Sequence, residues 1–179
     1  MNSGPKTIDV VANSFGKAIK TTLEKGTNRN IRYSKTFQAI PRVRLKPEVG
    51  CFVPFSGDYN GLVVMNFSSA AAMDLYSSYM IAMGLPEGEL AKEYTSNEVI
   101  DTMGEMTNQV MGRAMSMIKS KFDLTSFCGQ PKALALNSSI TLTPDMESQE
   151  NRRVSFTVGF SSFQMEIAME QTQFVPFVK

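Results

Sequence analysis

Apolar residues recur at helical spacing in three segments of the chain. The first segment covers about residues 8–25, and Gly26 follows it as an expected C-cap. The second covers about residues 68–84 and opens on a serine that can cap a helix. The third runs from residue 97 to about 121, and residues 95–98 before it have the spacing of a capping box. The pattern therefore predicts three helices.

The remaining segments have the patterns of strands and turns. Residues 30–47 look extended, with Pro41 interrupting the run. The strict alternation after it predicts that Val43 and Leu45 face inward, while Arg42, Arg44 and Lys46 face out. The turn sequence GDYNG, residues 57–61, predicts a hairpin between two β runs, and Pro54 predicts that one run lies at an edge or bulge. Three strand-like runs follow the third helix, at 133–143, 153–160 and 163–169.

The order of these elements, α-β-β-β-α-α-β-β-β, predicts an α+β fold. We expect a mostly antiparallel six-stranded sheet covered by helices. At 179 residues with 42% hydrophobic content, the chain suits a single domain over residues 1–179. The sequence does not open on a leader pattern, and no apolar run is long enough to cross a bilayer. A cytoplasmic protein without a membrane partner is therefore expected.

Missing residue types narrow the chemistry. The chain has no histidine, which excludes Ser-His-Asp and Cys-His triads and histidine-ligated zinc. Cys51 and Cys128 lack metal-ligand spacing and are expected to be buried free thiols. No glycine-rich phosphate loop is present, and a net charge of +1 does not favour nucleic acid. An enzyme of this composition would use carboxylates, amides or hydroxyls, or groups that a partner supplies.

The third helix carries a polar stripe on the side opposite its methionines. At about 100° per residue, four positions fall within about 60° of one another. They are Asp101, Glu105, Asn108 and Gly112. Most outward Glu and Asn side chains only solvate a helix. However, Asn108 and Gly112 are poor helix formers, and a glycine costs about 1 kcal/mol relative to alanine. A solvated face and a docking face both stay open on the residues alone.

The spacing D-x3-E-x2-N from Asp101 to Asn108 is followed by Pro131 after twenty-two intervening residues. This pattern resembles the signature of the CheC/CheX/FliY family of chemotaxis phosphatases. Residues 57–80 also resemble the hairpin-into-helix segment of that family. Because only one copy of the motif is present, the chain is most similar to the CheX branch, and a CheC/CheX-like fold is expected.

The resemblance implies an aspartyl-phosphate phosphatase that acts on a phosphorylated CheY-like response regulator. Asn108 would orient the attacking water, and Glu105 would pair with the regulator's invariant lysine. Asp101, Gly112 and Pro131 are expected to support the site, with Pro131 opening the strand beneath the helix. The resemblance implies no cofactor of the protein's own, because the Mg²⁺ is bound by the partner receiver domain.

Other interpretations remain beside this one. The chain could be a non-catalytic module of the same fold that only binds receiver domains. The basic segment 29–46 could bind a polyanion, although its alternation is more typical of a solvated strand. A homodimer is expected from the CheX resemblance, with residues 154–160 as the strand that could pair across a two-fold axis. Segments 27–47 and 143–153 look longer than is usual in the CheX branch, which leaves the identity of the regulator open.

Overall fold

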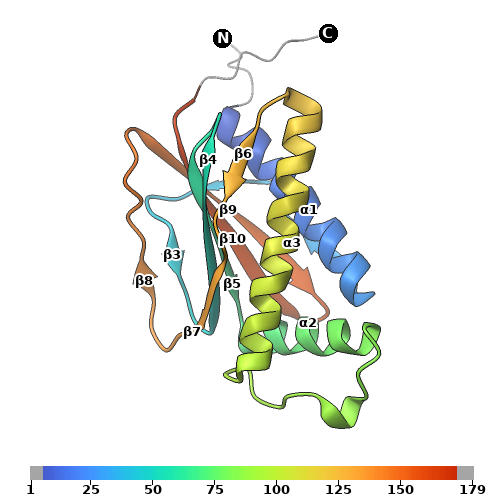
Figure 1. Cartoon of the computed structure of the whole chain (residues 1–179). Coiled ribbons are helices and arrows are strands. Elements are labelled where there is room, and N and C mark those ends of the chain that lie inside the picture. The colour runs from blue at the N-terminus through green and yellow to red at the C-terminus, as the bar shows by residue number, and fades with distance from the viewer. Residues whose placement is uncertain (1–5, 173–179) are drawn as a thin grey trace.

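The computed structural model describes residues 6–172 of the chain, and three α-helices lie within that range (Figure 1). They are α1 (Thr7–Thr27), α2 (Ser69–Ala82) and α3 (Asn97–Phe122), with a short 3-10 turn, η1 (Glu87–Glu89), before α3. The three predicted helices are confirmed. The end of α1 differs from the expected cap at Gly26, because the helix continues to Thr27 and Asn28 is its C-cap. That residue is left-handed (φ 55°), which lets its N–H reach the carbonyl oxygen of Glu24.

Over the same described range, eight strands form the main sheet, and two more form a small second sheet. The main sheet contains β1 (Ile31–Tyr33), β2 (Gln38–Ala39), β4 (Val49–Gly57), β5 (Gly61–Phe67), β6 (Ser126–Cys128), β7 (Lys132–Ala135), β9 (Gln149–Val158) and β10 (Ser161–Glu170). The small sheet pairs β3 (Arg44–Leu45) with β8 (Ile140–Thr141). All of these pairings are antiparallel, so the predicted α+β fold class is confirmed.

The main sheet is six positions wide, in the order β1-β9-β10-β5-β4-β6. Each edge position is divided between two short strands: β1 and β2 both pair with β9, and β6 and β7 both pair with β4. The extended run at 30–47 is broken around Pro41, as expected, and the run expected as one strand at 133–143 is broken as well. Pro41 interrupts the first run, and the polar turn after Leu136 directs the second away from the main sheet.

Pro54 lies where β6 gives way to β7 along β4. β6 pairs with residues 55–57 and β7 with residues 49–52, so the ladder is interrupted between them. In this gap the carbonyl oxygen of Pro54 accepts a hydrogen bond of 3.0 Å from the N–H of Gly129. Because proline has no N–H to donate, a gap at this position removes no ladder hydrogen bond. The irregularity expected at Pro54 is this interruption.

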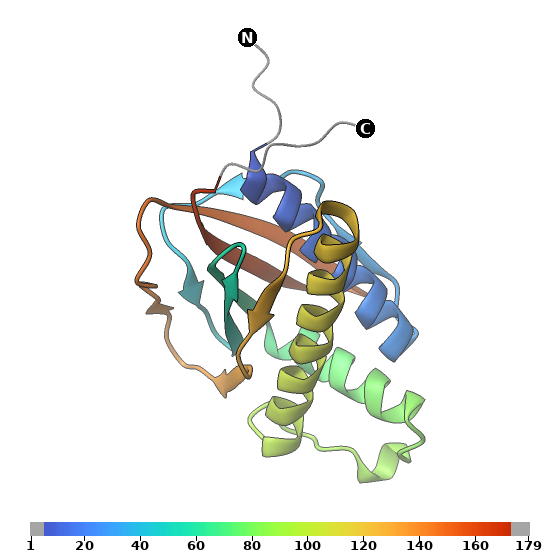
Figure 2. The same ribbon diagram turned by 45° about the horizontal axis from the view of Figure 1, so that its top comes forward.

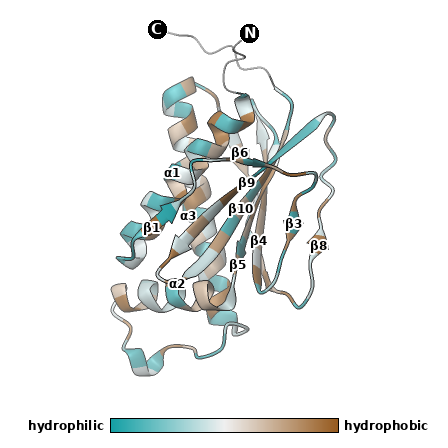
Figure 3. Cartoon of the chain, turned by 180° about the vertical axis from the view of Figure 1, so that it is seen from behind, coloured by the Kyte–Doolittle hydropathy of each residue, from teal (hydrophilic) through white to brown (hydrophobic). Residues whose placement is uncertain are grey.

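The helices cover one face of the main sheet, and the small sheet covers part of the other. Figure 1 shows α1, α2 and α3 on one side of the sheet and β3 and β8 on the other. Figure 2 shows α3 packed between α1 and β6, and Figure 3 shows the small sheet from behind. The larger core lies under the helices and includes Phe15 and Met65. A second apolar cluster contains Val43 and Leu45, so both face inward as expected.

A buried carboxylate fastens the small sheet to the main one. Glu166 of β10 has no exposed side-chain surface, and one of its oxygens lies 2.9 Å from Lys46 Nζ and 2.8 Å from a terminal nitrogen of Arg153. Its other oxygen accepts a 2.8 Å hydrogen bond from the backbone N–H of Arg44. Because both oxygens have donors, the cost of burying this charge is offset. We call Glu166, Lys46 and Arg153 the buried ion cluster.

Strand β9 lies inside the sheet and not at its edge. It pairs with β10 on one side and with β1 and β2 on the other. Residues 154–160, which we expected to pair across a two-fold axis, therefore offer no free edge to a second copy. That assignment of the dimer strand is wrong, and a homodimer would need another surface.

Candidate functional site

Helix α3 carries the predicted polar stripe and is capped at both ends. It begins after Ser96, whose hydroxyl accepts a hydrogen bond of 3.4 Å from the backbone N–H three residues further on. The predicted capping box of Thr95 and Glu98 is wrong, because the N-cap is Ser96, one residue later. Glu98 instead accepts a hydrogen bond of 3.3 Å from the Tyr76 hydroxyl. At the other end, Asp123 adopts a left-handed conformation with φ 58°. The stripe thus lies on a helix whose two ends are well defined.

The two faces of α3 separate as predicted. The buried face packs Met103, Met106 and Met111 into the main core, each with an exposed fraction of 2% or less. An added Cβ at Gly112 would meet no atom within 4 Å, so no packing contact within the described residues calls for glycine there. The exposed residues of the stripe are Asp101, Glu105, Asn108 and Gly112.

The segment at residues 130–133 lies against the same part of α3. Ala133 of β7 approaches the helix at Gly104, where an added Cβ would lie 3.5 Å from the Cβ of Ala133. The two elements enclose a shallow depression of about 360 Å³. Its lining residues are Ile100, Asp101, Gly104, Glu105, Asn108, Gln130, Pro131, Lys132 and Ala133.

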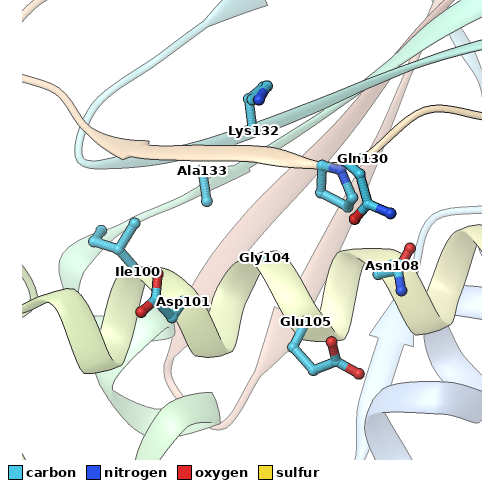
Figure 4. Close-up of a pocket in the computed structure, with 9 residues that line it drawn as sticks. Ile100, Asp101, Gly104, Glu105, Asn108, Gln130, Lys132 and Ala133 are labelled. Atoms are coloured by element: carbon cyan, nitrogen blue, oxygen red, sulfur yellow. The ribbon is translucent and has the colours of Figure 1, made fainter.

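The structure brings four of the five predicted site residues to this depression. Asp101, Glu105, Asn108 and Pro131 line it, whereas Gly112 lies one helical turn beyond. Two polar lining residues, Gln130 and Lys132, were not predicted, and their only sequence signal is that they flank the motif proline. In Figure 4, Lys132 points away from α3.

The polar groups of the site differ in their hydrogen-bond partners. The Gln109 carboxamide nitrogen donates to a carboxylate oxygen of Glu105 at 3.1 Å and to the Tyr79 hydroxyl at 3.3 Å. Within residues 6–172, the side chains of Asp101 and Asn108 make no hydrogen bond. The donor and the acceptor of the Asn108 carboxamide are therefore both available to water or to another molecule.

Metal and thiol chemistry are not indicated at the depression. Among residues 6–172, no group of three or more His, Cys, Asp or Glu side chains is arranged to hold a metal ion. Cys51 and Cys128 are free thiols, and neither lines the depression. Burial raises the pKa of the Cys51 thiol to about 12. Cys128 is only half-buried, so the expectation of two buried thiols holds for Cys51 alone.

The cations of the basic segment 29–46 fall into two groups: two have ion-pair partners in the fold, and four are exposed, namely Arg32, Lys35, Arg42 and Arg44. Arg29 forms an ion pair of 2.7 Å with Asp74, and Lys46 belongs to the buried ion cluster. The interleaved rings of Tyr33 and Phe37 pack against the main core, so they are not available to stack on bases. These contacts weaken the case for a polyanion site.

The described part of the chain contains no helix of the length and apolarity needed to span a membrane.

The fold is that of the CheX and CheC-like chemotaxis proteins. CheX from Desulfovibrio desulfuricans superposes with a TM-score of 0.75 at 17% identity, over 90% of this chain and 99% of its own. A CheC-like superfamily protein from Shewanella sp. PV-4 gives 0.75 at 18% identity, over 92% and 99%. A crystal structure of the CheX–CheY–BeF3–Mg²⁺ complex from Borrelia burgdorferi gives 0.67 at 16% identity, over 89% and 97%. The resemblance found in the sequence is thereby confirmed for the fold.

The chain belongs to the family described as "protein of unknown function (DUF3334)", which matches residues 5–179. No curated protein matches the chain.

Proposed function

We propose that this protein is a phosphatase that hydrolyses the aspartyl-phosphate of a CheY-like response regulator. The observation that carries the proposal is Asn108, an exposed carboxamide with no hydrogen bond to any residue within 6–172, one helical turn from Glu105 on a CheX-like fold. Phosphoryl transfer to water depends on placing the water and stabilising charge more than on covalent chemistry by the protein. A carboxamide can place the water, and a neighbouring carboxylate can hold the partner.

In the proposed reaction, the exposed face of α3 docks on the phosphorylated site of the regulator. The Asn108 oxygen accepts a hydrogen bond from the attacking water, and its NH2 group donates toward the phosphoryl group. The water oxygen forms its bond to phosphorus as the bond to the aspartyl oxygen breaks, which releases aspartate and inorganic phosphate. The Mg²⁺, held by the receiver domain, neutralises charge on the phosphoryl oxygens.

The other residues of the site have docking and supporting roles in this proposal. Glu105 pairs with the regulator's invariant lysine and fixes the register of the two proteins. Asp101 contributes a rim contact, and Pro131 fixes the backbone that forms the second wall. Gly112 leaves the helix surface bare, so that the partner can approach closely.

The partner class is supported by one of the proteins that share the fold, a CheX in complex with CheY, BeF3 and Mg²⁺. A role in chemotaxis-type two-component signalling, in the cytoplasm, is part of the proposal. The homodimer also stays a prediction, and sedimentation that gives a monomer at high protein concentration would remove it.

Decay of phosphorylated receiver domains from the same host tests the proposal. A pull-down with and without beryllium fluoride selects the receivers that bind, and the half-life of the phosphoryl group is then measured with and without this protein. We expect faster decay for at least one receiver. Binding without faster decay would favour the non-catalytic receiver-binding module. If no receiver binds and none decays faster, both interpretations are contradicted.

A further inference from the structure

We infer that Gln109 is a positioning residue that holds the Glu105 carboxylate in place by linking it to Tyr79 of α2. The inference rests on the proposed function, because the orientation of Glu105 matters only if that carboxylate contacts a partner. Gln109 does not line the depression, and it is not a position of the D-x3-E-x2-N motif.

The link uses both hydrogens of one carboxamide. The Gln109 nitrogen donates to Glu105 Oε1 at 3.1 Å and to the Tyr79 hydroxyl at 3.3 Å. A carboxamide nitrogen carries two hydrogens, so these two acceptors account for its full donor capacity. Gln109 is thereby held between a residue of its own helix and a residue of a neighbouring helix.

Tyr79 is a fixed reference point because its ring is held by packing. The ring is half-buried against the main core. It also lies against Gly26 of α1, where an added Cβ would come within 3.2 Å of a ring carbon. Glycine at this position therefore lets the ring sit close to α1. The hydroxyl that accepts from Gln109 is consequently anchored by α1 and α2 together.

An exposed glutamate normally samples several rotamers, and a partner that binds it must fix one of them. Fixing a flexible side chain beforehand raises affinity by a factor of about 2 to 10. Gln109 restrains Glu105 in this way before the regulator arrives. It acts through the docking carboxylate and not through the water, so its loss should weaken binding and leave the maximal rate unchanged.

The simpler explanation is an ordinary surface pair, since Glu105 and Gln109 are four residues apart on one helix. Such pairs make a small contribution to helix stability and none to a partner's binding. The two explanations differ in one measurable respect. A positioning role changes the concentration of this protein needed for half-maximal decay, whereas a surface pair changes only the stability of the helix.

A double-mutant cycle tests the inference. The decay of the phosphorylated receiver is measured against the concentration of this protein, which separates the half-saturating concentration from the maximal rate. We expect Gln109→Ala to raise the half-saturating concentration by about 3- to 10-fold with an unchanged maximal rate. Gln109→Glu keeps the size but removes the donors and adds a like charge, so its effect should be at least as large. In a Glu105→Ala background, Gln109→Ala should have no further effect.

The control is Gln38→Ala, an exposed glutamine on β2 at the opposite edge of the sheet, which should change neither quantity. The inference is overturned if Gln109→Ala has no effect, if its effect persists in the Glu105→Ala background, or if Glu105→Ala itself is silent. An unchanged maximal rate in Asn108→Ala would instead count against the proposed function. If the protein binds a receiver without accelerating decay, the double-mutant cycle is measured with dissociation constants instead.

Discussion

Two polar sites on opposite sides of the sheet use their hydrogen-bonding groups differently. In the buried ion cluster, both oxygens of Glu166 have partners, and the side chain has no exposed surface. On α3, the Asn108 side chain is exposed and makes no hydrogen bond to any residue within 6–172. The first arrangement holds two sheets together. The Asn108 side chain stabilises no contact within the described residues, so we assign its hydrogen-bonding groups to a partner.

The same contrast separates stability from function in the predictions. Removing a group whose partners lie within the chain should change the free energy of unfolding. Removing a group whose partner lies outside should change binding or rate and leave unfolding nearly unaltered.

The largest expected effect on stability is that of Glu166→Ala. It leaves Lys46 and Arg153 close together without their shared carboxylate, so we expect a loss of about 3 kcal/mol in the free energy of unfolding. Urea unfolding measures this loss. The control is Glu150→Ala, which removes a more exposed ion pair with Lys6 and should cost less than about 1 kcal/mol. Equal effects of the two variants would contradict the assigned role of the buried ion cluster.

A smaller effect, on binding alone, is expected from Glu105→Ala. We expect the affinity for the beryllium-fluoride-activated receiver to fall about tenfold, which equals ~1.4 kcal/mol, because a docking charge is lost. Titration calorimetry measures the affinity. The free energy of unfolding should stay within about 0.5 kcal/mol of the starting protein, since the side chain is exposed. A receiver that binds Glu105→Ala as tightly as the original chain would remove this residue from the docking face.

Gly112→Ala should raise the free energy of unfolding and lower the affinity for the receiver. The added methyl group meets no atom within 4 Å, so the helix should gain about 0.5 to 1 kcal/mol in unfolding experiments. Receiver binding should weaken if the bare surface lets the partner approach. Ser116→Ala, another exposed position of α3, is the control and should leave binding unchanged. A gain in stability without any loss of binding would place Gly112 outside the docking face.

The smallest perturbation is alkylation of the two thiols, which compares a buried and a half-buried group directly. Only the thiolate reacts, and burial raises the pKa of Cys51 to about 12, so almost none of it is ionised at pH 8. We expect iodoacetamide to modify Cys128 in the native protein and Cys51 only after unfolding, as peptide mass mapping would measure. Early labelling of Cys51 would contradict the burial of that strand.

Much of the site could be predicted from the sequence because helical geometry fixes which residues share a face. The long periodic run of α3 gave its start at Asn97 and the exposure of Glu105 and Asn108. Pro131 was predicted only through the family resemblance. Gln130 and Lys132 were missed, because packing between distant segments brings them to α3. The link through Gln109 was missed because Tyr79 lies on another helix.

The edges of the fold were harder to predict than its centre. Strands as short as β2 and β3, two residues each, leave no periodicity to count. Alternation correctly placed Val43 and Leu45 inward, but it also placed Lys46 in solvent. The small sheet instead folds over the main one and brings Lys46 to Glu166, a contact across 120 positions of sequence that no local pattern encodes.

The role of Asn108 is tested most directly by comparing Asn108→Ala with the unaltered chain in two measurements on the same receiver. We predict that stimulated decay of the aspartyl-phosphate falls at least ~10-fold, because the water is no longer placed, while affinity for the beryllium-fluoride-activated receiver changes less than about 3-fold. Unchanged stimulated decay in Asn108→Ala would contradict the assignment of this carboxamide as the group that aims the water.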